Sequence, residues 1–204
     1  MENILSIFVK AVFVENMVFA FFFGMCSYIA VSKSVKTAMG LGIAVTFVMV
    51  TTVPLNYLLN EYVLSPGALA WINPEFGTDG AHPVDLSFLS FIVFIAVIAS
   101  FVQLVEMVVE KFTPTLYNQL GIFLPLIAVN CAILGGSLFM QEREYATLGE
   151  APGVGWWLAI VLMAAIREKM AYSNVPAPLQ GAGITFILTG LMGIAFMTFL
   201  GIQL

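Results

Sequence analysis

Long apolar stretches separated by short polar segments run along the whole chain. A helix needs about 20 mainly apolar residues to cross the hydrocarbon core of a bilayer. Six stretches approach or meet that length: one within residues 4–31, which Lys10, Glu15 and Asn16 interrupt, and then residues 38–59, 86–109, 119–140, 145–166 and 179–201. Strands of a lipid-facing barrel would alternate polar and apolar residues. The pattern therefore predicts an all-α integral membrane protein with six transmembrane helices.

Composition supports a membrane location and removes other classes of protein. Of the 204 residues, 61% are hydrophobic and 9% are charged. Soluble domains have about 45–50% hydrophobic residues and about 25% charged residues. The 7 Lys+Arg residues are outnumbered by 12 Asp+Glu and form no basic stripe, which excludes a nucleic-acid-binding protein. The two cysteines lie far apart inside apolar stretches, so they do not form a disulfide framework.

The basic residues of the predicted loops indicate the orientation of the chain. The first, third and fifth loops carry Lys33, Lys36, Lys111, Arg167 and Lys169, whereas the second and fourth carry only Arg143 among several acids. Basic loops remain on the cytoplasmic side, so both termini are expected on the outer, periplasmic side. No loop is long enough for a soluble domain, and residues 1–204 are expected to form a single membrane domain without a nucleotide-binding fold.

An internal repeat divides the six helices into two groups of three. Aligning Cys26 with Cys131 places residues 13–34 over 118–139, and an Ala-x-Gly-x-Gly motif recurs at 38–42 and 151–155. The predicted repeats cover residues of about 12–110 and about 115–203, with helix one starting near Val12 and residues 1–11 lying at the outer interface. Because each repeat has three helices, the two repeats are expected to be inverted. Functional sites of such folds lie near the midplane.

Cys26 and Cys131 are the first candidates for chemistry, because the repeat places them at similar depth on oppositely directed helices. A buried free cysteine commonly acts as a small hydrophobic residue. Alternatively, two thiolates form half of a four-thiolate zinc or iron–sulfur site. His82, the single histidine, lies in the second loop and would not reach the midplane. A metal site would therefore need a second chain for its other ligands.

Other polar positions within the apolar stretches leave two interpretations open. They are Glu15 and Asn16 near the start of helix one, Gln103, Glu106 and Glu110 on one face of helix three, and Asn130 beside Cys131. Ionisable groups inside a membrane are costly and often functional, for instance along a cation path. They can also reach water near the membrane surface. Pro125, six residues before Cys131, predicts a bend or an unwound turn there.

Several short motifs are distributed along the chain: Glu15-Asn16-Met17, Gly24-Met25-Cys26 and the segments 30–33, 121–127, 129–133 and 165–176. Together they resemble the family of membrane proteins that includes the D and E subunits of sodium-translocating NADH:quinone reductases and the A subunit of Rnf ferredoxin:NAD complexes. The resemblance covers essentially the whole chain, and residues 120–131 are its most specific part. Within the family, Glu15-Asn16-Met17 and residues 167–176 are more similar to the E subunit of the quinone reductase than to the Rnf protein.

The resemblance implies a role in a redox-driven sodium pump. In this family the D and E subunits form an inverted pair, and each supplies two cysteines to a shared iron centre, a [2Fe–2S] cluster. The matching cofactor and metal ligands here would be Cys26 and Cys131. The chain would then pass electrons across the bacterial cytoplasmic (inner) membrane during NADH oxidation, ubiquinone reduction and Na⁺ export. Its partners would be the A, B, C, D and F subunits; alone it would be neither catalytic nor a binder of nucleotide or flavin.

Three alternatives remain open at the level of the sequence. The chain could be the A subunit of an Rnf complex. It could be a stand-alone transporter or channel, because inverted repeats with polar residues near the midplane also suit that class. It could also be a structural scaffold with chemically inert cysteines. Co-purification with partners and colour would distinguish the electron carrier from a stand-alone transporter, and a silent Cys→Ala substitution would indicate the scaffold.

Overall fold

A computed structural model describes residues 4–64, 87–112, 124–143 and 150–201. All regular elements in these ranges are helical, which confirms the all-α prediction. Of the second loop, Glu61 lies in η2, whereas Glu75, Asp79, Asp85 and His82 lie outside the described residues, as does the predicted start of repeat two. The helices are α1 (Ile4–Val9), η1 (Lys10–Val14), α2 (Met25–Val31), α3 (Val35–Leu59), η2 (Asn60–Leu64), η5 (Ser87–Leu89), α4 (Ser90–Phe112), α6 (Leu124–Ala128), α7 (Cys131–Arg143), α8 (Glu150–Met170), η6 (Ala177–Leu179), α9 (Ala182–Met197) and η7 (Thr198–Gly201).

Two of the described helices are long and apolar enough to cross a membrane. They are Val35–Leu64, formed by α3 and η2, and Ser90–Phe112, which is α4. Residues Pro125–Met140 and Ala182–Met197 form shorter apolar helices. The second and third predicted stretches therefore correspond closely to α3 and α4. The fifth and sixth correspond to α8 and to α9, which is flanked by the 3₁₀ turns η6 and η7.

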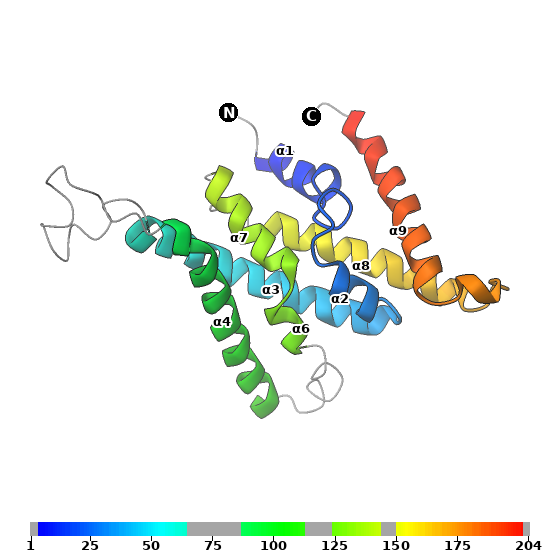
Figure 1. The fold of residues 1–204 in the computed structure, drawn as a ribbon, viewed down its shortest axis with the longest axis horizontal. Helices are drawn as coiled ribbons and strands as arrows, with labels where there is room; N and C mark the ends of the chain where they lie inside the picture. Colours follow the sequence, from blue (N-terminus) through cyan, green and yellow to red (C-terminus); the bar gives the residue numbers. More distant parts are fainter. Residues whose placement is uncertain (1–3, 65–86, 113–123, 144–149, 202–204) are drawn as a thin grey trace, which may run out of the picture.

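Helices α3 and α8 run antiparallel and side by side through the middle of the molecule (Figure 1). Small residues let them approach closely. The ring of Trp157 occupies the space that a side chain at Gly42 would need, and Gly153 lies against the backbone of Thr46. The pair forms the centre on which the other helices pack.

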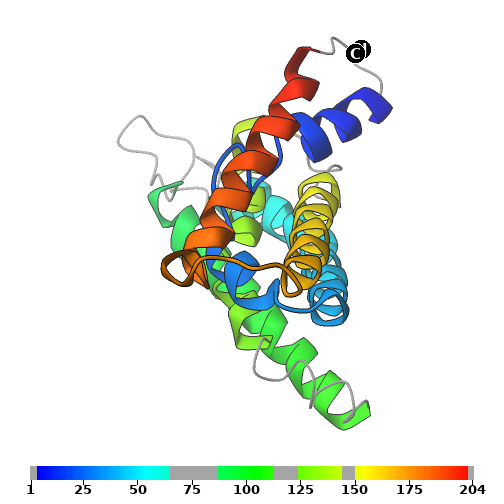
Figure 2. The same ribbon diagram turned by 90° about the vertical axis from the view of Figure 1, so that its right-hand side faces the viewer.

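Helices α4 and α9 diverge from this central pair in opposite directions (Figures 1 and 2). Helix α4 contacts α3, α6 and α7, whereas α9 contacts α8 and η1. Both leave large apolar side chains exposed, among them Phe91, Ile95 and Leu104 on α4 and Phe186, Ile187 and Ile194 on α9. Such faces suit contact with lipid or with another membrane chain.

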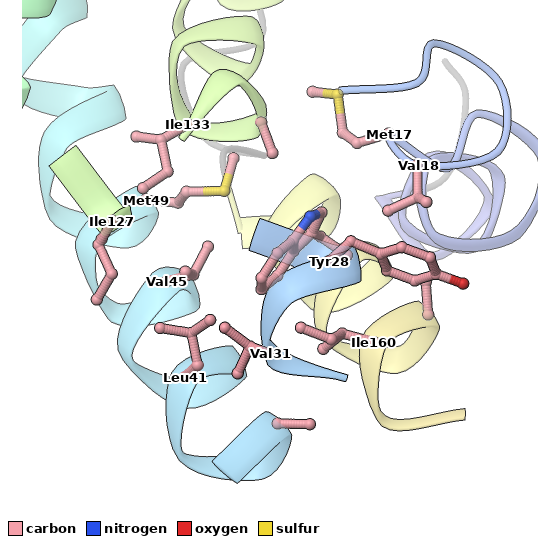
Figure 3. Close-up of a cluster of buried hydrophobic side chains, with 14 of the residues drawn as sticks. Met17, Val18, Tyr28, Val31, Leu41, Val45, Met49, Ile127, Ile133 and Ile160 are labelled. Atoms are coloured by element: carbon pink, nitrogen blue, oxygen red, sulfur yellow. The ribbon is translucent and has the colours of Figure 1, made fainter. Parts of the chain in front are cut away.

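The buried core joins segments that are far apart in the sequence. Figure 3 shows Met17 before α2, Tyr28 in α2, Leu41 in α3, Ile133 in α7 and Ile160 in α8 gathered in one cluster. All five side chains are almost fully buried. The core therefore holds the residues on either side of both cysteines in a fixed arrangement.

The prediction that helix one starts near Val12 is wrong, and the interruption predicted within residues 4–31 takes the form of a break in the helix. A helix is already formed at residues 4–14, residues 15–24 are not in a regular helix, and α2 restarts at Met25. The cause is Asn16, whose Nδ2 donates to the carbonyl oxygens of Val12 and Gly155, while its Oδ1 accepts from the backbone N–H of Val18. These side-chain bonds replace helical ones and favour a turn.

The fourth stretch is also interrupted, but not at the predicted residue. Pro125 lies in the first turn of α6, where a missing N–H costs little. The interruption comes at residues 129–130, between α6 and α7. There Asn130 Oδ1 accepts a hydrogen bond of 3.1 Å from the backbone N–H of Ala132. An asparagine thus shapes the break in each of the two cysteine-bearing stretches.

Candidate functional site

Both cysteines lie where a helix restarts after a break. Cys26 is the second residue of α2, and Cys131 is the first residue of α7. Both thiols are free, and both residues are exposed at the surface of this chain. They are therefore not the buried packing residues that the first interpretation of the sequence suggested. Their exposure makes them available to a ligand or to another chain.

The two breaks touch each other through Gly24. This residue has a φ of 76° and precedes α2, in a backbone conformation that glycine adopts readily. A Cβ at Gly24 would lie 2.8 Å from Asn130 Oδ1 and 3.1 Å from the Cβ of Ala132. The absence of a side chain thus allows the segment of Cys26 to contact the segment of Cys131. We call residues 22–26 together with 129–132 the cysteine junction.

Two buried N–H donors beside the junction have no hydrogen-bond partner among the described residues. They are Asn130 Nδ2 and Trp156 Nε1, and the latter would lie 2.5 Å from a Cβ at Gly24. Buried polar groups are nearly always paired in native proteins. Unpaired donors at this place suit a negatively charged group, such as thiolates that hold a metal centre.

The far end of α2 is fixed by Arg167 of α8. Its Nη1 donates hydrogen bonds of 3.0 Å to the carbonyl oxygen of Ile29 and 2.7 Å to Ser32 Oγ. Ser32 follows the last residue of α2, so the guanidinium binds the C-terminal end of that helix. Arg167 therefore helps to hold the helix that carries Cys26.

The donor set at the junction fits half of a four-thiolate centre. No group of three or more His, Cys, Asp or Glu residues converges within the part of the chain that the structure describes. An iron–sulfur cluster held by cysteines requires four thiolates. In such a cluster Cys26 and Cys131 would supply two thiolates, and the remaining two would have to come from another chain.

The other predicted candidates do not form a second cluster with the cysteines. The half-buried Glu15 lies 3.7 Å from Lys10 in an ion pair within its own segment. Glu106 is half-buried and Glu110 is exposed, both near the end of α4. Asn130 alone among them lies at the cysteine junction.

Three contributors to the site were not identified as such from the sequence. Gly24 and Phe22 both have a positive φ, of 76° and 58°, and Trp156 packs behind the junction with its N–H unpaired. The signal for Gly24 was its place two residues before Cys26 in a stretch already interrupted by Asn16. Nothing in the local sequence marks Phe22 or Trp156.

Comparisons with known proteins agree with the resemblance seen in the motifs. The family model described as "Rnf-Nqr subunit, membrane protein" matches residues 4–203. The chain is 57% identical to a protein of Maridesulfovibrio salexigens over 209 aligned residues that cover all of both chains. It is 58% identical to proteins of Rhodopirellula baltica and Psychromonas ingrahamii, over 100% of this chain and 99% and 100% of theirs. Each of the three relatives is named as the E subunit of a Na(+)-translocating NADH-quinone reductase.

Proposed function

This chain belongs to the Rnf-Nqr family of membrane proteins, and from that premise we propose that it is the E-type subunit of a Na⁺-translocating NADH-quinone reductase. The relatives reported above carry that name, which favours the quinone reductase over the Rnf complex. The observation that carries the proposal is the placement of two exposed thiols at adjoining helix breaks. A packing role does not require that placement, whereas a shared redox centre does.

We infer that the chain crosses the membrane six times in two inverted repeats. In this arrangement helix one consists of α1, η1 and α2, and helix four consists of α6 and α7. The contacts support it: the third helix, α4, packs on the fourth, as the sixth, α9, packs on the first. Likewise α3 packs on α4 as α8 packs on α9. The second helices of the two repeats, α3 and α8, form the antiparallel central pair (Figure 1).

We infer further that both termini lie on the periplasmic side of the cytoplasmic membrane. The start of α1 and the end of α9 lie at the same end of the molecule (Figures 1 and 2), which supports an even number of crossings. The basic residues of the odd-numbered loops then place the other end in the cytoplasm.

The proposed cofactor is a [2Fe–2S] cluster shared with a homologous chain, the D subunit of the same complex. When bound, such a cluster accepts and donates single electrons. Cys26 and Cys131 would hold it as thiolates. The contact of Gly24 with Asn130 and Ala132 sets the separation of the two thiol-bearing segments. The unpaired N–H groups of Asn130 and Trp156 lie by the turn of Gly24, two residues before Cys26, and would there favour the negative charge of thiolates.

The test is to measure iron in the complex purified through a tag on this chain. Wild type is compared with Cys26→Ala, Cys131→Ala and a control, Ser100→Ala. Ser100 is an exposed residue on α4 that bonds only to the carbonyl oxygen of Ala96 in its own helix. We expect both cysteine variants to lose the iron–sulfur absorption and EPR signal and to stop quinone reduction. NADH oxidation by an artificial acceptor should continue in all four proteins.

Two results would contradict the proposed function. If both cysteine variants keep full iron content and quinone reduction, the thiols are packing residues and the proposed centre does not exist. If wild type purifies alone and colourless, a stand-alone transporter becomes the better interpretation.

A further inference from the structure

Phe22 has an unusual backbone conformation for a large side chain. Its φ is 58°, in the left-handed region where a residue with a Cβ is disfavoured and a bulky one is rare. Its side chain is 67% exposed. An unfavourable backbone that presents an aromatic ring to the outside calls for a reason, because such conformations cluster at ligand-binding and functional sites.

The neighbours of Phe22 explain how the conformation is enforced. The rings of Phe21 and Phe23 both pack on Phe139 of α7, with centroids 4.7 and 6.1 Å away. The ring of Phe23 also lies directly over Gly135. The backbone N–H groups of residues 22 and 23 donate to the carbonyl oxygens of Val18 and Met17. With both flanking residues fixed inward, Phe22 is forced to point outward.

Phe22 stands at the cysteine junction, and the turn before Cys131 also carries an exposed apolar side chain. Phe22 precedes Cys26 by four residues, and Val129 precedes Cys131 by two. Val129 is 69% exposed. Each exposed thiol is thus accompanied by an exposed apolar side chain on the turn before it, and the contact of Gly24 with Asn130 joins the two turns.

We propose that Phe22 is an anchor residue through which the cysteine junction packs against a second membrane chain that supplies two further thiolates. The proposal rests on the proposed function, because the site of Cys26 and Cys131 is incomplete without that chain. Phe22, with Val129, would fill an apolar pocket of the second chain and exclude water from the four sulfur atoms. Aromatic side chains that enter a pocket near the centre of an interface commonly dominate binding.

Lipid is the competing occupant, and the structure favours the second chain. Contact with lipid needs no particular backbone conformation, because a regular helix already presents apolar side chains to the outside, as it does at Phe186. Phe186 is 56% exposed and lies on the regular helix α9. A strained turn that presents one ring beside two exposed thiols suits binding to a defined protein surface rather than contact with fluid lipid.

The experiment measures how fast a water-soluble iron chelator removes iron from the purified complex. Wild type is compared with Phe22→Ala, Phe22→Gly, Phe22→Leu and the matched control Phe186→Ala. We expect Phe22→Ala and Phe22→Gly to lose iron at least about tenfold faster than wild type. Phe22→Leu keeps most of the apolar volume and should stay within about threefold of wild type, and Phe186→Ala should not differ from it.

Phe22→Gly separates anchoring from a purely local structural role. Glycine relieves the left-handed backbone, so the resistance of this chain to limited proteolysis should be kept or increased while iron loss accelerates. The anchoring role would also be supported if the purified Phe22→Gly complex lost the second chain while this chain still resisted proteolysis. Equal iron release from the Phe22 variants, Phe186→Ala and wild type would overturn the proposal and leave lipid as the occupant. A wild-type complex without iron would instead refute the proposed function itself.

Discussion

Asn16 in the first helix break donates a hydrogen bond of 2.8 Å from Nδ2 to the carbonyl oxygen of Gly155 in α8. The two residues are 139 positions apart, and Asn16 is almost completely buried. The same amide also bonds the carbonyl oxygen of Val12 and the backbone N–H of Val18. One side chain therefore ends η1, starts the following turn and ties both to the central helix.

Replacing Asn16 by leucine should destabilise the protein. The backbone N–H of the buried Val18 would lose its side-chain partner, and a buried polar group without a partner costs about 1–3 kcal/mol. We expect Asn16→Leu to lower the free energy of unfolding by about that amount, as measured by denaturant titration in detergent.

The control for Asn16 is Thr51→Val. Among the described residues, the Thr51 hydroxyl donates to carbonyl oxygens of its own helix, which already accept backbone bonds in the helical pattern. This variant should stay within about 0.5 kcal/mol of wild type. Equal destabilisation by the two variants would contradict the role assigned to Asn16.

Gly24→Ala should open the cysteine junction. A methyl group at this position would meet Trp156 and Asn130 within van der Waals distance and would also strain a backbone with φ 76°. Left-handed strain and overpacking together cost about 2–4 kcal/mol. We expect the variant to have a lower melting temperature and a reduced iron content in the purified complex.

Gly190→Ala is the matched control for the junction. Apart from its own helix backbone, no atom of the described residues lies within 4 Å of the place that a Cβ of Gly190 would take, in the middle of α9. Alanine is a better helix former than glycine by about 1 kcal/mol, so this variant should be as stable as wild type or more so. If Gly24→Ala behaves in the same way as Gly190→Ala, the junction is not tightly packed.

The sequence was sufficient to predict the long helices and to mark the first and fourth stretches as interrupted, but not to predict how each break is formed. The apolar runs at 38–59 and 86–109 lie within or close to α3 and α4, because hydrophobicity and length alone define such helices. The break after Glu15 depends on a bond from Asn16 to Gly155, and no local pattern records a contact so distant in the sequence. The same holds for Phe22, whose conformation follows from rings that pack on Phe139 in another helix.

Candidate ligands were easier to predict than the geometry around them. The aligned positions of Cys26 and Cys131 in the repeat were sufficient to select both residues. Their exposure could not be predicted, because it depends on how Gly24 and Asn130 bring the two breaks together. The polar residues of α4 were selected only because polar groups are costly to place inside a membrane. Among the described residues, no group of three or more His, Cys, Asp or Glu residues forms a site with them.

Arg167→Gln should loosen α2 without unfolding the chain. The substitution removes the charged bonds to the carbonyl oxygen of Ile29 and to Ser32 Oγ, and charge-assisted bonds contribute about 1.5–3 kcal/mol. We expect amide hydrogen exchange to become faster across Met25–Val31 and to stay unchanged in α4. Lys169→Gln changes an exposed charge in the same turn of α8 and should leave exchange in α2 as it is; faster exchange in both variants would point to a general effect of charge.

The last prediction concerns a buried polar pair that joins α3 to α7. Asn56 Nδ2 donates a hydrogen bond of 2.9 Å to Ser137 Oγ, and both residues are fully buried. A double-mutant cycle with Asn56→Ala and Ser137→Ala should give a coupling of about 0.5–1.5 kcal/mol in the free energy of unfolding, because the bond is lost only once. Pairing Asn56→Ala with Ser100→Ala, which lies on the exposed side of α4, should give additive effects. If the effects of Asn56→Ala and Ser137→Ala were also additive, the two side chains would not interact. Helix α7 would then be held against α3 by apolar contacts such as that of Gly136 with Met49.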